Sequence, residues 1–468
     1  MKLKPYLYIS LFAGVVSFSS CEKLLEIDPP LNERPSAAIF LSESTAKSAL
    51  AGAYANLSTT AAFNQDFTVV NALAGGEVAF VGSTAQLDFM QNTYDPVTTT
   101  KLNSIWSDIY KNVYLFNSII EGLNNNVSIS APVVMQMTGE AKTMRAFCYF
   151  HLINMFGDVP LVTQTDANIN QNIARTPIAD IYNYIIKDLE EAKNLVADEY
   201  VSNGGIRSRG QVNRSAVCAL LARIYLHVGN YTLAAQNASA VIAKTDLYSL
   251  LPTQNLADVF LKDSKEAILQ LGSAVLVTTG YTVEGSTFIP STIATVANYE
   301  LAPSLINAFE VQDKRFSNWI LESNLSSKKT YQPFKYRAST SANATALGRF
   351  EVPMVLRLSE QYLIRAEARL KLNNTLAALE DVNVIRQRAG LQTITSTNGL
   401  EEEILKQRQL EFFCELGDRW YSIKRTGKAD AIMRDLRPQT WQSFAKLYPI
   451  PQTARDANPL LSQNDGYR

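Results

Sequence analysis

Apolar residues recur at steps of three and four along most of this chain, which is the spacing of one buried face of an α-helix. Helical patterns of this kind cover residues 101–123, 135–155, 178–195, 215–228, 232–244, 359–372, 375–388 and 399–415. The clearest example is residues 101–123, whose stripe consists of Leu102, Ile105, Ile109, Val113, Phe116, Ile119 and Ile120. Because a helix with one apolar face must bury it against a neighbour, the sequence predicts a mostly α-helical body.

Two of these helix pairs are alike. The tetrapeptide Thr-Leu-Ala-Ala opens the second helix of both, at residues 232–235 and 375–378, and each pair has a short turn of Gly or Asn before it. Such units resemble tetratricopeptide repeats, which bury their faces by stacking. Their spacing is irregular, so we expect TPR-like hairpins inside one large body and not a regular solenoid. The expected hairpins lie near residues 101–156, 178–244, 359–388 and 399–425.

Three other stretches carry no helical period. They are rich in Thr, Ser, Asn and Gly and cover residues 75–100, 275–298 and 323–349. Long loops on a rigid scaffold often carry binding sites, so we expect a loop-rich ligand region near residues 75–100 and 275–349. A few short β-strands, such as residues 267–271 and 354–358, are expected to pair locally.

Aromatic residues stand in or beside these loops. Flat rings offer apolar faces to sugar C–H groups or to peptide side chains, while neighbouring Asn, Gln and Asp can satisfy hydroxyls. The alternative is that the rings cover the helical body. The predicted ligand-binding residues are Phe80, Phe89, Tyr94, Tyr281, Phe288, Tyr299 and Trp319.

The N-terminus has the pattern of an export signal. Lys2 and Lys4 precede an apolar run at residues 7–16, which is too short to span a membrane. Small residues then lead to Cys21, as in a lipobox, whose cysteine carries the lipid of a lipoprotein. An ordinary secretory signal that ends near a cysteine is the alternative. We expect a signal peptide at residues 1–20, a lipidated tether at 21–41 and the helical body at 42–468.

The composition excludes several other functions. A net charge of −1 provides no basic surface for nucleic acid. The chain has two histidines, His151 and His227, both expected to be helix-face residues with a satisfied hydrogen bond, and we expect no metal and no cofactor. No common catalytic motif occurs, so a non-enzyme is expected, although a pair of catalytic carboxylates remains open. The remaining cysteines are expected to be buried small apolar residues: Cys148, Cys218 and Cys414.

Several motifs carry a family likeness. They occur in order along the chain, at residues 139–150 (GEAKTMRAFCYF), 155–161 (MFGDVPL), 210–214 (GQVNR), 408–427 and 447–467. This series resembles the signature of the SusD/RagB family of surface lipoproteins from Bacteroidetes. The motif residues themselves are expected to form buried ion pairs and core anchors, among them Arg145, Glu411, Arg419 and Trp420.

The resemblance implies a non-enzymatic lipoprotein on the outer face of the outer membrane. Such proteins cap a SusC-like TonB-dependent transporter as a hinged lid and pass oligosaccharides, or in some members peptides, inward. We therefore expect a protein that captures glycans and delivers them to such a transporter, and that binds no nucleic acid. Three alternatives stay open: a peptide-binding member of the family, a surface glycosidase, and a TPR scaffold that binds only proteins.

Overall fold

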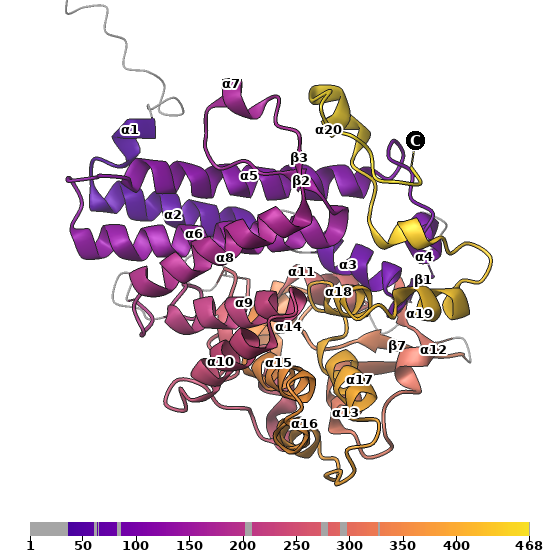
Figure 1. The fold of residues 1–468 in the computed structure, drawn as a ribbon. Helices are drawn as coiled ribbons and strands as arrows, with labels where there is room; N and C mark the ends of the chain where they lie inside the picture. The colour runs from indigo at the N-terminus through magenta and orange to yellow at the C-terminus, as the bar shows by residue number, and fades with distance from the viewer. Residues whose placement is uncertain are drawn as a thin grey trace, which may run out of the picture.

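A continuous series of contacting helices runs through the molecule (Figure 1). The computed structural model describes residues 36–59, 63, 65–81, 86–201, 208–272, 279–290, 297–325 and 328–467. Each helix of the series contacts the next, in the order α2 (Glu43–Thr59), α5 (Thr100–Leu123), α6 (Ala131–Phe156), α8 (Ile178–Leu195), α9 (Arg214–His227), α10 (Tyr231–Ile242), α15 (Leu358–Lys371) and α16 (Thr375–Arg388). The helical body predicted from the apolar periodicity is therefore confirmed.

The predicted hairpins correspond to pairs of contacting helices. Residues 101–156 form α5 and α6, and residues 359–388 form α15 and α16. Within residues 178–244, α9 and α10 make the hairpin, while α8 packs on α6 as well as on α9. The last predicted pair is α17 (Leu400–Phe412) with α18 (Asp418–Arg425). Almost all of the apolar stripe of α5 is buried, as its spacing predicts.

The strands in the described ranges pair two by two, always antiparallel. The pairs are β1 (Val78–Phe80) with β5 (Tyr299–Leu301), β2 (Val159–Pro160) with β3 (Arg175–Thr176), β4 (Ala267–Gln270) with β8 (Met354–Arg357), and β6 (Ile320–Leu325) with β7 (Lys328–Pro333). Both strands expected from the sequence exist, but the expectation of local pairing is wrong. β4 and β8 are fully buried and pair with each other across a long stretch of sequence, because each needs a buried partner for its backbone.

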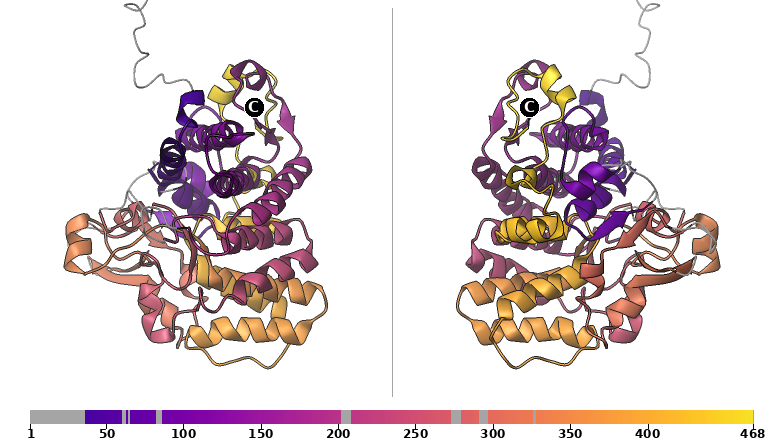
Figure 2. Two further views of the ribbon diagram at one scale, coloured as in Figure 1. Left: turned by 90° about the vertical axis from the view of Figure 1, so that its left-hand side faces the viewer. Right: turned by 90° about the vertical axis from the view of Figure 1, so that its right-hand side faces the viewer.

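Short elements occupy much of the regions expected to be loops. The described residues between 250 and 350 form a lobe beside the helical series (Figure 2). Side chains of Thr282, Asp313 and Thr340 accept backbone N–H bonds and cap α11 (Val283–Phe288), α13 (Lys314–Trp319) and α14 (Ser341–Ala346). The other short helices are α1 (Ser36–Ile39), α3 (Gln65–Ala74), α4 (Leu87–Gln91), α7 (Ala167–Asn170), η4 (Thr253–Asp258), α12 (Pro303–Ile306), α19 (Ala429–Leu436), η5 (Ser443–Lys446) and α20 (Gln452–Ala457).

The motif residues are mostly structural, as predicted. Arg145 is buried in α6 and forms an ion pair with Asp188 of α8 at 2.8 Å. Trp420 is fully buried, whereas Arg419 is partly exposed. The three cysteines within the described ranges are free and buried, which confirms their expected role as small apolar residues. None of the helices in those ranges has both the length and the apolar character needed to cross a membrane.

The two histidines lie on helices, as expected. His151 is buried in α6, and its Nδ1 lies 3.4 Å from the hydroxyl of Tyr421. Its Nε2 has no partner within the described part of the chain. Only one of the two ring nitrogens therefore has the hydrogen-bond partner that we expected. Burial, with a smaller effect of the Arg223 charge, lowers the pKa of His151 well below its ordinary value. A neutral, buried imidazole of this kind contributes to packing.

Candidate functional site

The pairing of β1 with β5 joins two of the predicted loop regions. Phe80 lies opposite Tyr299 in this ladder, and the two ring centroids are 5.1 Å apart. The ring of Phe288 lies 5.6 Å from that of Tyr299, whose hydroxyl accepts a 2.5 Å hydrogen bond from Gln86. Phe288 and Tyr299 are buried, whereas Phe80 is partly exposed. Phe80 is therefore the ring of this aromatic cluster that contacts solvent.

The other predicted rings lie elsewhere. Phe89 and Tyr94 are buried, and both pack against Tyr448 near the C-terminus. Trp319 is fully buried and donates its indole N–H to the carbonyl of Leu256 at 2.8 Å. Tyr281 is half-buried in the segment before α11.

The structure does not gather the seven predicted residues into one surface. The five buried rings are core residues, and their placement does not fit direct contact with a ligand. The reason is that burying a large ring stabilises the fold, so an aromatic in a polar stretch often reaches into the core. Phe80 and Tyr281 are the two whose side chains reach solvent.

A cavity of about 600 Å³ opens between α2, α6 and the C-terminal end of α8. Its walls are largely apolar, and its polar lining includes the Tyr54 hydroxyl, the Gln136 amide and the Glu140 carboxyl, with Lys47, Asn194, Gln211 and Arg214 also among the lining residues. Tyr54 and Gln136 donate hydrogen bonds to Glu140 at 2.8 and 2.9 Å. Burial raises the pKa of Glu140 to about 7. Such a cavity suits an apolar group that ends in a hydrogen-bonding function. The sequence did not predict this cavity, because its walls come from three helices and from ordinary apolar positions.

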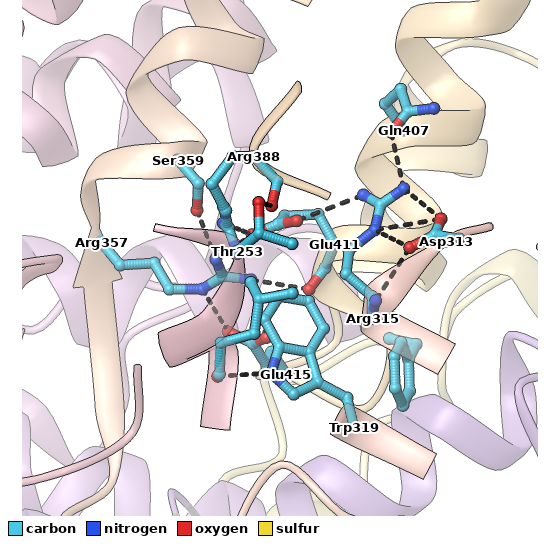
Figure 3. A network of polar contacts seen from close by, with 12 residues as sticks. Thr253, Asp313, Arg315, Trp319, Arg357, Ser359, Arg388, Gln407, Glu411 and Glu415 are labelled. Carbon is cyan, nitrogen blue, oxygen red and sulfur yellow. Dashed lines mark hydrogen bonds and ion pairs between the residues drawn. The ribbon is translucent and has the colours of Figure 1, made fainter. Parts of the chain in front are cut away.

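A cluster of acidic and basic side chains lies deep in the protein, and we call it the charged core (Figure 3). It contains Arg315, Lys335, Arg357, Arg388, Glu266, Asp313, Glu411 and Glu415. Glu411 accepts from Arg357 at 2.5 Å and from Arg315 at 3.3 Å, and it also pairs with Arg388. The charged core therefore combines four basic side chains with four acidic ones.

Electrostatics in the charged core point to stabilisation. Burial alone would raise the pKa of Glu411, but the guanidinium groups of Arg388, Arg357 and Arg315 hold it well below its ordinary value. The side chains of Arg315, Arg357 and Glu411 are at most 1% exposed. Perturbed carboxylates can mark catalytic sites, but these are paired and closed to a substrate. The charged core accordingly holds α13, α16 and α17 together.

Glu77 is a second buried carboxyl with an unusual environment. Its Oε2 accepts the Cys414 N–H at 3.1 Å, and its Oε1 has no partner among the described residues. Burial raises the pKa of Glu77 to about 8, against the opposing hydrogen bond and the charges of Arg419 and Lys335. Burial likewise raises the pKa of Glu284 to about 7. These carboxyls are neutral in the folded protein at mildly acidic pH.

This environment predicts how stability depends on pH. The folded protein retains a proton on Glu77 that the unfolded chain releases near pH 4.5, so the contribution of this group to stability is fully present below that pH and decreases as the pH rises to about 8. We expect Glu77→Gln to flatten part of this decrease in thermal unfolding experiments between pH 5 and 9. Glu402→Gln, whose carboxylate is 70% exposed, is the control and should leave the profile unchanged. A Glu77→Gln profile identical to that of the parent protein would contradict the assignment.

The described residues contain no group of three His, Cys, Asp or Glu side chains that could hold a metal ion. Arrangements open to a ligand include the Phe80 cluster at β1 and β5, the half-buried Tyr281 and the cavity beside α2. All of them can bind by apolar contact and hydrogen bonding. Their geometry suits recognition of a ligand.

Comparison with known proteins identifies the family to which this chain is similar. A SusD-like family model described as "starch-binding associating with outer membrane" matches residues 23–226, and the SusD family model matches residues 317–467. SusD-like protein P25 of Formosa agariphila is 24% identical, over 97% of this chain and 98% of that protein.

Solved structures share the fold. A SusD superfamily protein from Bacteroides vulgatus superimposes with a TM-score of 0.77 at 19% identity, over 92% of this chain and all of that one. A structure named "Laminarin binding SusD-like protein" has a TM-score of 0.75 at 24% identity, over 91% of this chain and all of that one. With two family models that together match more than half of its length, this chain is a member of the SusD/RagB family.

Proposed function

We propose that this protein is a cell-surface lipoprotein that captures glycans and delivers them to a SusC-like TonB-dependent transporter in the outer membrane. The observation that carries the proposal is the match to two SusD family models, one of them described as starch-binding and associated with the outer membrane. A structural neighbour of the same fold is named as laminarin-binding, which favours a glycan. Cys21 is the proposed lipid attachment site, and it lies outside the described residues.

The proposed action is binding without chemistry. A glycosidase needs two carboxyl groups on either side of a glycosidic bond, open to the substrate. The strongly perturbed carboxyl groups Glu77 and Glu411 are buried in the core, and Glu140 is the single carboxyl among the described residues that line the cavity beside α2, where a glycosidase would need two; this supports a binding protein. Assays for released sugar on every glycan that binds test this part of the proposal.

Binding experiments distinguish the ligand classes. The purified chain without residues 1–21 is applied to an array of plant, microbial and host glycans and, in parallel, to a peptide library. Saturable binding of a glycan supports the proposal. Binding to peptides alone would replace it with the second candidate, a peptide-binding member of the family.

One observation favours that second candidate. The cavity beside α2 has mainly apolar walls around the Glu140 carboxyl, and an apolar peptide side chain fits such walls better than a sugar does. Ala51 lies in the cavity wall. Ala51→Trp would fill part of the space, so it should weaken peptide binding and leave glycan binding unchanged.

Phe80 is the predicted ring best placed to contact the glycan, because it caps the aromatic cluster and is partly exposed. We expect Phe80→Ala to weaken binding of the selected glycan about three- to tenfold, the usual effect of losing one aromatic contact. Calorimetric titration measures the change. The control is Leu376→Ala, which shortens an apolar side chain that is 71% exposed on α16 and should have no effect. Equal affinities for Phe80→Ala and the parent protein would remove Phe80 from the site.

A further inference from the structure

A groove of about 460 Å³ lies along the C-terminal half of α5, beside the end of α1. Three segments form its walls: the turn after α1, the C-terminal half of α5 with the loop that follows it, and the segment after β2. The side chains that matter below are Phe40, Tyr114, Ser118, Glu121, Asn125 and Thr165.

Backbone and side-chain contacts fix the walls of this groove. The ring of Phe40 lies directly on Gly122, where an added Cβ would come within 2.1 Å of it. Asn126 donates from its amide to the carbonyls of Phe40 and Gly122 at 2.9 and 3.1 Å. Glu121 accepts from the backbone N–H and the hydroxyl of Thr165 at 2.9 and 2.5 Å. The groove is therefore preformed, which reduces the entropy cost of binding.

Several groups in the groove remain available to a ligand. Tyr114 and Ser118 are one turn apart on the same face of α5, and the Tyr114 side chain is 50% exposed. Within the described part of the chain, no hydrogen bond engages the side chains of Tyr114, Ser118 or Asn125. Leu41 and Val127, at the rim, are 68% and 96% exposed. The groove thus offers one aromatic face, two hydroxyls and an amide between apolar edges.

The charge of the groove selects among ligands. Of the described residues that line it, Glu121 alone is charged, so no cation is present to pair with a sulfate, phosphate or carboxylate. An aromatic face with hydroxyl and amide partners suits the C–H and O–H groups of an uncharged sugar ring. The volume lies within the range of small-molecule sites.

We infer that this groove on α5 is a second glycan-binding site, which takes a neutral oligosaccharide with a sugar ring stacked on Tyr114. The inference rests on the proposed function, because it assumes that glycans are the ligand class. The groove beside α1 is also separate from β1, the strand that ends at Phe80, and α1 and β1 lie at opposite sides of the molecule in Figure 1. Two separate sites on one molecule would hold a long glycan more tightly than either site alone, through an increased effective concentration.

The experiment uses a reporter in the groove itself. The soluble chain carries 4-(trifluoromethyl)phenylalanine at position 114, or at position 376 as a control, and its ¹⁹F resonance is followed during titration. The probes are laminarihexaose, maltohexaose, cellohexaose and xylohexaose, with a hexamer of galacturonic acid as the charged comparison. We expect the resonance at position 114 to shift and saturate with a neutral hexaose, and the resonance at 376 to stay unchanged.

Variants complete the test. Tyr114→Ala should weaken binding of the same hexaose about three- to tenfold, whereas Leu376→Ala should not. The ¹⁹F shift should persist in Phe80→Ala. If the hexaose binds but the resonance at 114 does not move, the groove is excluded and the proposed function stands. If no glycan binds the parent protein at all, both proposals fail.

Discussion

Replacing Glu411 by alanine should decrease the free energy of unfolding by about 3–5 kcal/mol, the usual cost of breaking a buried ion pair. The carboxylate faces three guanidinium groups, those of Arg315, Arg357 and Arg388, and its removal leaves these charges buried without their shared partner. Urea unfolding monitored by circular dichroism measures the change. Glu411→Gln, which keeps the size but not the charge, should be destabilised as well.

The same helix offers a matched control. Glu401, in the first turn of α17, pairs with Lys371 at 3.0 Å, and both side chains are more than 30% exposed. Surface pairs of this kind contribute about 0–1 kcal/mol, so Glu401→Ala should be nearly neutral. Similar losses for Glu401→Ala and Glu411→Ala would show that the charged core contributes no more than a surface ion pair.

Cys21→Ala should release the protein completely from the membrane, because the proposed lipid attaches to this thiol. We expect the protein to be recovered in the soluble fraction, with the circular dichroism spectrum and melting temperature of the lipid-free chain. The measurement is fractionation of cells that express the variant, followed by immunoblotting of the outer-membrane and soluble fractions.

A second cysteine variant makes this result interpretable. Cys218 is a buried free cysteine on α9, so Cys218→Ala should keep the protein at the membrane. If the Cys21→Ala protein stays in the outer-membrane fraction, lipid attachment at this residue is wrong. Protease treatment of intact cells then tests the orientation, since a protein on the outer face is digested.

Sequence periodicity was sufficient to predict the helical body, because a buried helix face leaves a regular apolar pattern, as in α5. It also indicated β4 and β8 as strands, but not that they pair with each other. Strand partners that are distant in sequence depend on tertiary packing, which the local pattern does not record. The short helices of the lobe were missed for a related reason. Their caps, such as Thr282 and Asp313, stabilise too few residues to produce a periodic signal.

The candidate site was predicted less well than the fold. Polar composition directs attention to the stretch around Phe80, yet composition does not tell which ring is exposed. Trp319 and Tyr94 lie in polar stretches but are buried. Tyr114, by contrast, lies in a strongly helical segment and is half-exposed. Exposure of a single ring depends on the neighbours that the fold brings to it, and only the structure supplies them.

We expect this protein to bind a glycan and not to cleave it. The most direct test is calorimetric titration of the soluble chain with the glycan selected from the array, followed by chromatography of that glycan after prolonged incubation. We expect a saturable isotherm and an unchanged chain length of the glycan. Shorter products would contradict this expectation by revealing an enzyme, and the absence of any heat or binding across the glycan panel would contradict the proposed ligand class.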